Sequence, residues 1–159
     1  MTKPDEIMRV GIIGTGRIAE KAAITLRGLT EVEAYAVGSR HQDTADAFAK
    51  KWDIPKAYGS YAALIADPDI DLIYIGTPHS HHFDVTREAI LSGKPCIVEK
   101  AFMANSRQTQ EILDLAHQQK VFVAEAIWTR YQPVVSIIRN LISSGPNSHL
   151  YFLFFPYIL

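Results

Sequence analysis

The sequence has one cysteine, Cys96, among 159 residues, so no disulfide bond can form within the chain. An excess of charge of one sign is also absent, since 16 basic residues stand against 17 acidic ones and the formal net charge is −1. Nucleic acids and anionic membranes are bound through clustered basic charge, so neither is expected as a partner. A reducing compartment, the cytoplasm, is the expected location.

Long apolar runs are absent until the end of the chain. Residues 1–7 carry two acidic residues and no apolar stretch, so they do not resemble a signal peptide. The ten residues Leu150–Leu159 carry no charge, but a membrane-crossing helix needs about 20 apolar residues. We therefore expect no membrane partner, and we expect this apolar tail to favour homo-oligomerisation or aggregation.

Strand patterns and amphipathic helix patterns alternate along the chain. Strands are predicted at Met8–Ile13, Glu33–Val37, Asp71–Ile75, Pro95–Val98 and Val121–Glu125. Helices are predicted at Arg17–Leu29, Asp43–Trp52, Ser60–Ala66, His82–Ser92 and Ser106–Gln119, with Ser60 and Asn105 as caps and Gly93 just past a helix end. Strands separated by helices predict an α/β fold, a doubly wound parallel sheet of the Rossmann type with helices on both faces. Cys96 is then an inert thiol in a buried strand.

A glycine-rich turn joins the first predicted strand to the first predicted helix. Gly14 allows a tight turn, Gly16 lets the backbone approach a pyrophosphate, and Ala19 is small enough for helix to pack on strand. The phosphates would lie on the free N–H groups of the helix N-terminus. A purely structural turn is the alternative. The residues expected to bind a dinucleotide here are Gly14, Thr15, Gly16, Arg17 and Ile18.

The end of the second predicted strand bears on which dinucleotide is bound. NAD sites place an acidic residue there to hold the ribose hydroxyls. This chain has Ser39 and Arg40 instead, a hydroxyl donor and a planar cation suited to a 2′-phosphate. NADP is therefore the predicted cofactor, with NAD kept as the alternative. Arg40 as an ordinary solvated loop residue is the competing interpretation.

Three histidines follow the strand Asp71–Ile75. A metal site is not favoured, because no Asp, Glu or Cys stands at ligand spacing before Asp84. A loop at the carboxyl edge of a parallel sheet more readily lines a cofactor crevice. The residues predicted to contribute are Thr77, Pro78, His79 and His82.

Four motifs in order resemble the N-terminal half of the Gfo/Idh/MocA oxidoreductases, within the dihydrodiol dehydrogenase-like subgroup. They are the glycine turn, the Thr-Pro-His loop, the segment Gly93–Phe102 with its Glu99-Lys100-Ala101, and the segment Glu125–Arg130. The resemblance implies an NAD(P)-dependent dehydrogenase whose small-molecule substrate, a sugar, diol or related hydroxyl or carbonyl compound, is oxidised or reduced by hydride transfer. It also implies that Glu99 lies at the cofactor and that Lys100 is the catalytic residue beside the nicotinamide, where an ammonium stabilises alkoxide charge.

Two further expectations depend on this resemblance. Ala101 stands where the family usually has proline, so a cis Lys100–Ala101 peptide is not expected. Trp128 and Arg130 match a cofactor-cleft element of the subgroup, with a packed tryptophan and a surface arginine as the equally favoured alternative.

The domain organisation follows from the same comparison. We expect a Rossmann domain at residues 1–125, a connecting segment and helix at 126–145, and a tail outside the family pattern at 146–159. The resemblance implies a second α/β domain, which is expected to be missing here through truncation. The chain is thus predicted to be an incomplete NAD(P)-dependent oxidoreductase, with a catalytically inactive dinucleotide-binding module as the alternative.

Overall fold

The computed structural model describes residues 7–144, which divide into two compact units between Ala126 and Ile127. The first unit holds one sheet of six parallel strands in the order β3-β2-β1-β4-β5-β6. Its strands are β1 (Met8–Ile13), β2 (Val32–Gly38), β3 (Lys56–Tyr58), β4 (Leu72–Ile75), β5 (Cys96–Val98) and β6 (Val123–Glu125). This is the strand order of a dinucleotide-binding Rossmann fold, and it confirms the predicted class.

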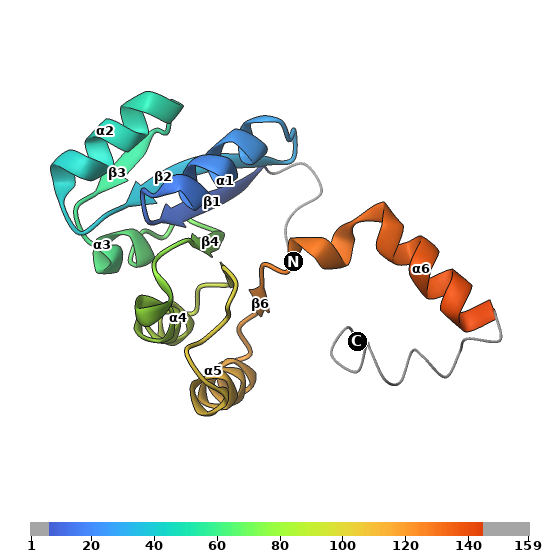
Figure 1. The fold of residues 1–159 in the computed structure, drawn as a ribbon. Coiled ribbons are helices and arrows are strands. Elements are labelled where there is room, and N and C mark those ends of the chain that lie inside the picture. The colour runs from blue at the N-terminus through green and yellow to red at the C-terminus, as the bar shows by residue number, and fades with distance from the viewer. Residues whose placement is uncertain (1–6, 145–159) are drawn as a thin grey trace. The chain divides into compact units, whose positions relative to one another are not determined.

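Helices cover both faces of the sheet (Figure 1). Those of the first unit are α1 (Arg17–Arg27), α2 (Gln42–Trp52), α3 (Tyr61–Ile65), α4 (His82–Leu91) and α5 (Ser106–Gln119), with a short 3₁₀ helix η1 (His79–His81) before α4. Side chains of α1 and α2 form one buried cluster, and side chains of α3, α4 and α5 form another. The sheet is therefore doubly wound.

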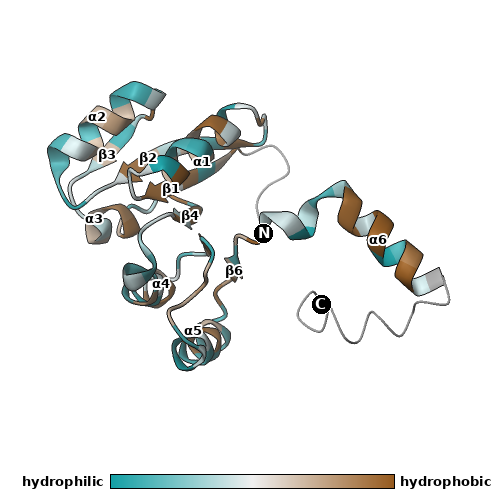
Figure 2. Cartoon of the chain, in the orientation of Figure 1, coloured by the Kyte–Doolittle hydropathy of each residue, from teal (hydrophilic) through white to brown (hydrophobic). Residues whose placement is uncertain are grey.

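The alternation of side chains along the strands produces these two clusters. Ile12 packs with α1 and α2, whereas its neighbour Ile13 packs on the other face, and neither side chain is exposed. In β2, Val37 packs in the cluster with α1 and α2, and Ala36 packs in the cluster on the other face. Because both faces are covered, the central strands β1 and β4 are mostly apolar, as the brown colour of these strands in Figure 2 shows.

Most of the predicted boundaries hold to within two residues. The Asn105 side chain accepts a hydrogen bond from the Gln108 N–H (3.0 Å), and Ser60 caps α3 through the Ala63 N–H (3.2 Å). Gly93 follows α4 with a φ of +73°. Cys96 is fully buried and burial raises the pKa of its thiol to about 12, which confirms it as an inert core residue.

One strand was not predicted from the sequence. Strand β3 has three residues and pairs only with β2, at the edge of the sheet. Pro55 and Gly59 flank it, so the local pattern is that of a loop. The strand forms because β2 supplies a long-range partner.

Near the amino ends of β1 and β4, charged groups are paired. Lys56 Nζ lies 3.0 Å from Asp67 and 3.1 Å from Asp69, and the Tyr35 hydroxyl donates to Asp69 (3.0 Å). Burial acts to raise the pKa of Asp67, but hydrogen bonds from Tyr58, the Asp69 N–H and Lys56 outweigh it and lower that pKa below its usual range. These contacts fasten β3 to the loop before β4.

The second unit contains a 3₁₀ helix, η2 (Trp128–Tyr131), and helix α6 (Pro133–Ser144). Several large apolar side chains of α6 are more than half exposed: Val134, Ile137 and Leu141. No helix within residues 7–144 has the length and apolar character needed to cross a membrane. The apolar tail lies outside the described residues.

Candidate dinucleotide-binding site

The site lies at the carboxyl ends of β1, β2, β4 and β5. The Gly14 N–H donates to the Gly38 carbonyl and the Gly76 N–H to the Ile13 carbonyl, each at 2.9 Å, so the first turns after β2, β1 and β4 are tied together. Helix α1, which follows β1, packs on one face of the sheet, whereas α3, which precedes β4, packs on the other face. A crevice outside the strand ends at such a switch point is where open α/β sheets bind ligands.

The two glycines of the turn after β1 differ in what the fold demands of them. Gly14 has a φ of +109°, and a Cβ built on it would lie 2.8 Å from the Gly76 carbonyl oxygen. Gly14 is therefore required by the protein itself. Gly16 has an ordinary φ of −82°, and its Cβ would meet no atom within 4 Å. The packing of the chain does not require glycine at position 16.

Helix α1 begins directly after Gly16 without a side-chain cap on its first N–H groups. Uncapped N–H groups and the positive end of the helix dipole attract an anion. The bare backbone at Gly16 lets a phosphate come close to them. The turn therefore fits a pyrophosphate, and Thr15, Arg17 and Ile18 lie on the same turn and first helical residues.

Arg17 and Arg40 place cations at this end of the sheet. Both residues are exposed, and among the described residues neither side chain makes an ion pair or a hydrogen bond. Ser39, beside Arg40, is 7% exposed and its N–H donates to the Tyr58 carbonyl (2.9 Å). In contrast with the paired charges near the amino ends, these guanidinium groups remain available to an anionic ligand.

The ring of His82 packs beneath the surface of the loop after β4 and contacts backbone carbonyls on both sides. This ring is fully buried, and its Nε2 lies 2.9 Å from the Thr77 carbonyl oxygen. Its Nδ1 lies 3.0 Å from the Ala101 carbonyl and 3.1 Å from the Phe102 carbonyl. His82 therefore joins the loops after β4 and β5 and offers no surface to a ligand. The hydroxyl of Thr77 is buried and has no hydrogen-bond partner among the described residues.

His79 lies above His82, and the two rings meet edge to face at 5.3 Å between centroids. His79 is exposed, as is Pro78 before it, and its Nε2 lies 2.8 Å from the Lys100 carbonyl and 3.1 Å from the Ala101 nitrogen. The structure thus brings the loop after β4 against the predicted catalytic segment. In the described residues, no three His, Cys, Asp or Glu side chains cluster in a way that would hold a metal ion.

The Lys100–Ala101 peptide is cis, so the expectation of a trans bond is wrong. That expectation used only the local preference of a peptide that precedes a residue other than proline. The contacts from His79 and His82 to this segment span about 20 residues of sequence and are not visible in the local pattern.

Glu99 and Lys100 follow β5. The Tyr74 hydroxyl donates to Glu99 Oε1 (2.7 Å), and the Lys100 N–H donates to Oε2 (3.2 Å). Lys100 is exposed, and its ammonium makes no ion pair or hydrogen bond with any described residue. Farther along the loop, the Phe102 N–H donates to Glu125 at the end of β6 (2.8 Å). The segment is thus fixed at its backbone while the Lys100 side chain stays free.

Sequence reasoning missed two residues of this region, Tyr74 and Glu125. Tyr74 lies inside an apolar strand, where its hydroxyl gives no local signal. Glu125 ends a predicted strand and begins the last of the four motifs, but the sequence predicts no contact for its side chain. Because carboxyl ends of adjacent parallel strands meet, the β5–β6 neighbourhood would have suggested Glu125, but strand adjacency is not readable from the sequence.

Trp128 and Arg130 lie in η2 of the second unit. Trp128 is 64% exposed within the described structure, and Arg130 is also exposed. A role for either residue in cofactor binding stays a prediction.

We expect His82→Ala to destabilise the first unit by about 2–3 kcal/mol, because the change removes a fully buried ring together with its hydrogen bonding to the loops after β4 and β5. Urea unfolding followed by circular dichroism measures the loss. His117→Ala, on the exposed side of α5, is the matched control and should change the free energy of unfolding by less than about 0.5 kcal/mol. An equal effect of both changes would contradict the assigned role of His82.

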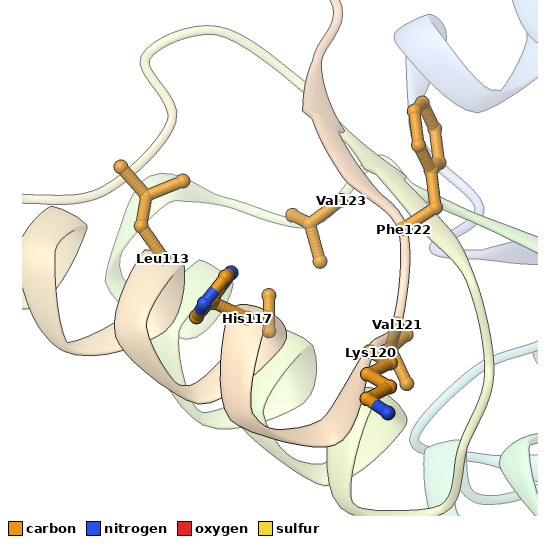
Figure 3. A pocket seen from close by; sticks show the side chains of 7 residues that line it. Leu113, His117, Lys120, Val121, Phe122 and Val123 are labelled. Carbon is orange, nitrogen blue, oxygen red and sulfur yellow. The ribbon is translucent and has the colours of Figure 1, made fainter.

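A separate groove lies between α5 and the start of β6, as Figure 3 shows. Its volume is about 560 Å³, and apolar side chains predominate in it, among them Leu113, Phe122 and Val123. His117 and Lys120 are its polar members. None of the residues predicted to bind the dinucleotide lines this groove.

Comparisons with known proteins agree with this geometry. D-xylose 1-dehydrogenase (NADP(+)) of Hypocrea jecorina is 40% identical over 150 residues, covering 87% of this chain and 38% of that protein. Trans-1,2-dihydrobenzene-1,2-diol dehydrogenase of Xenopus laevis is 42% identical over 135 residues, covering 84% of this chain and 41% of that protein. The chain therefore spans about two fifths of the length of these relatives.

Solved structures show the same fold. An NAD-binding oxidoreductase from Klebsiella pneumoniae superposes with a TM-score of 0.82 at 26% identity, covering 87% of this chain and 39% of that one. A 3-ketoreductase from Actinomadura kijaniata in complex with NADP has a TM-score of 0.81 at 24% identity, covering 89% of this chain and 45% of that one, and supports the fold alone. The model of the oxidoreductase family with an NAD-binding Rossmann fold matches residues 8–126. The chain therefore belongs to the Gfo/Idh/MocA oxidoreductase family, through the dinucleotide-binding domain of that family.

Proposed function

We propose that this chain binds NADP(H) at the carboxyl ends of its strands, as the cofactor-binding part of a dehydrogenase acting on a sugar, diol or related hydroxyl or carbonyl compound. The observation that carries the proposal is Gly16, whose missing side chain the protein's own packing does not explain. An uncapped helix N-terminus beside it and unpaired Arg17 and Arg40 suit the phosphates of a dinucleotide. The NADP dependence named for the Hypocrea jecorina relative supports the choice of cofactor.

The order of the strands sets the direction in which a dinucleotide would extend. With the pyrophosphate at Gly14–Gly16 after β1, the 2′-phosphate of the adenosine half would meet Ser39 and Arg40 after β2, on one side of β1. The other half would extend over the ends of β4 and β5, on the opposite side. The nicotinamide would then lie near Thr77, Glu99 and Lys100.

When bound, the cofactor supplies the acceptor or donor of a hydride. The chain supplies the group that holds the reacting oxygen. The Lys100 ammonium, free of intramolecular partners in the described chain, would donate a hydrogen bond to the substrate oxygen and stabilise the alkoxide charge that develops there. His79, His82 and Glu99 would keep the Lys100 backbone in place through the contacts described above.

A catalytically inactive dinucleotide-binding module is the second candidate. It is favoured by the fact that the chain spans about two fifths of its curated relatives, while the first unit alone contains the whole proposed phosphate site. We also propose a cytoplasmic location, because the single cysteine is buried and unpaired. Self-association through the apolar tail is a further proposal, and the tail lies outside the described residues.

Cofactor preference is the first test of the proposal. NADPH should bind more tightly than NADH, and Arg40→Ala should weaken NADPH binding about 10- to 100-fold while leaving NADH nearly unchanged, because a charge-assisted contact contributes about 1.5–3 kcal/mol. Fluorescence titration with both cofactors measures this.

Arg27→Ala is the matched control, since Arg27 is an equally exposed arginine at the far end of α1. It should leave both affinities unchanged. Equal affinities for NADPH and NADH in the unmodified chain would contradict the assignment of Arg40 to the 2′-phosphate.

A further inference from the structure

Glu99 is a carboxylate held in a fixed position at the carboxyl end of β5. The Tyr74 hydroxyl, which comes from the neighbouring strand β4, donates to its Oε1 at 2.7 Å. The Lys100 N–H donates to its other oxygen at 3.2 Å. A phenol on β4 and an N–H of the loop after β5 therefore hold the two oxygens of one half-buried carboxylate.

Tyr74 is suited to this task because it stays protonated. Burial raises the pKa of its phenol, and the hydrogen bond to Glu99 and the charge of that residue raise it further. A protonated phenol remains a donor over the whole physiological range. Tyr74 therefore acts as a positioning residue for the Glu99 carboxylate.

The charge of Glu99 has no cationic partner in the described part of the chain. No ion pair links it to Lys100 or to any other described side chain, and its two hydrogen-bond donors are neutral. A half-buried, unneutralised carboxylate exerts a stronger field on a nearby ligand than an exposed ion pair does. The field of Glu99 acts at the place where the proposed function puts the nicotinamide ring.

We propose that Glu99, oriented by Tyr74, makes the site discriminate between the two redox states of the cofactor in favour of the oxidised form. The inference deepens the proposed function and rests on it. The oxidised nicotinamide ring carries a positive charge and the reduced ring does not, whereas the phosphates are the same in both forms. A fixed carboxylate beside the ring therefore stabilises the complex with NADP⁺ and has little effect on the complex with NADPH.

The test compares dissociation constants of NADP⁺ and NADPH for the 159-residue chain, measured by isothermal titration calorimetry at pH 7. In Glu99→Gln, which keeps the shape and removes the charge, the ratio of the NADP⁺ constant to the NADPH constant should rise about tenfold. In Tyr74→Phe, which keeps the charge and removes the orienting donor, the ratio should rise by a smaller factor, about threefold.

The matched control is Tyr35→Phe, which removes the same hydroxyl from another tyrosine–carboxylate pair, that with Asp69 near the amino ends of the strands. Its ratio should equal that of the unmodified chain. An unchanged ratio in both site variants, or an equal weakening of both redox forms, would overturn the inference while leaving the proposed function standing. Absence of binding of either form to the folded, unmodified chain would overturn the proposed function and this inference with it.

Discussion

A valine at position 16 is expected to abolish dinucleotide binding while the chain still folds. The Cβ position at Gly16 meets no protein atom within 4 Å, and the backbone there has an ordinary φ of −82°, so the fold accommodates the side chain. The branched side chain would occupy the space through which a pyrophosphate reaches the N–H groups of α1. We expect an affinity loss of at least about a hundredfold, because several charge-assisted hydrogen bonds are lost together.

Two other glycines make this experiment selective. Gly28→Ala, at the opposite end of α1, should leave binding unchanged, since its Cβ would make only an ordinary contact of 3.4 Å with the Thr25 carbonyl. Gly14→Val should unfold or strongly destabilise the first unit, because its φ is +109° and its Cβ would approach the Gly76 oxygen to 2.8 Å. Circular dichroism reports whether each variant folds, and NADPH titration reports whether each folded variant still binds the cofactor. A folded Gly16→Val chain that binds NADPH normally would reduce the glycine turn to a structural feature.

The second large effect concerns catalysis. The 159-residue chain is expected to bind NADP(H) but to oxidise no sugar or diol at a measurable rate. Hydride transfer requires the substrate carbon to be held against the nicotinamide, and such orientation can supply about 7–11 kcal/mol of the barrier. Lys100 alone offers one donor to the substrate oxygen. The curated relatives extend well beyond the matched region, which is about two fifths of their length.

Joining residues 1–145 to the unmatched remainder of the Hypocrea jecorina D-xylose dehydrogenase should therefore produce NADP-linked oxidation. Lys100→Ala in that fusion should lower kcat by about a hundredfold or more, the usual effect of removing a donor that stabilises an oxyanion. Lys94→Ala is not a suitable control, because the Lys94 ammonium donates to the Asp67 and Ile70 carbonyls. The control is therefore Lys50→Ala, at an exposed position on α2. Rapid turnover by the 159-residue chain alone would show that every catalytic residue lies within it.

The sequence was enough for the features that local chemistry determines. The glycine turn, the caps at Ser60 and Asn105 and the amphipathic face of α2 are determined within a few residues, and the structure confirms them as structural elements. The alternation of strands and helices then leads to the doubly wound class, because parallel strands require crossovers. The glycine turn also gave the position of the candidate phosphate site.

What the sequence did not reveal depends on partners that are distant along the chain. Strand β3 exists only because it pairs with β2. The contacts of His82 with the loop after β5 span about 20 residues of sequence. Because of these contacts His82, which the sequence predicts to bind the cofactor, is fully buried. The Tyr74–Glu99 hydrogen bond joins side chains 25 residues apart. Such contacts become visible only once the order of the strands is known.

The central claim is that NADPH binds along the carboxyl ends of β2, β1, β4 and β5. Amide chemical shifts of the ¹⁵N-labelled chain, recorded while NADPH is added, test both binding and its location. The account predicts saturable shifts at the loops after these strands, around Gly16, Arg40, Thr77 and Lys100, with little change at Asp69 near the amino ends. Shifts confined to the α5–β6 groove, or none at all in a folded chain, would contradict it.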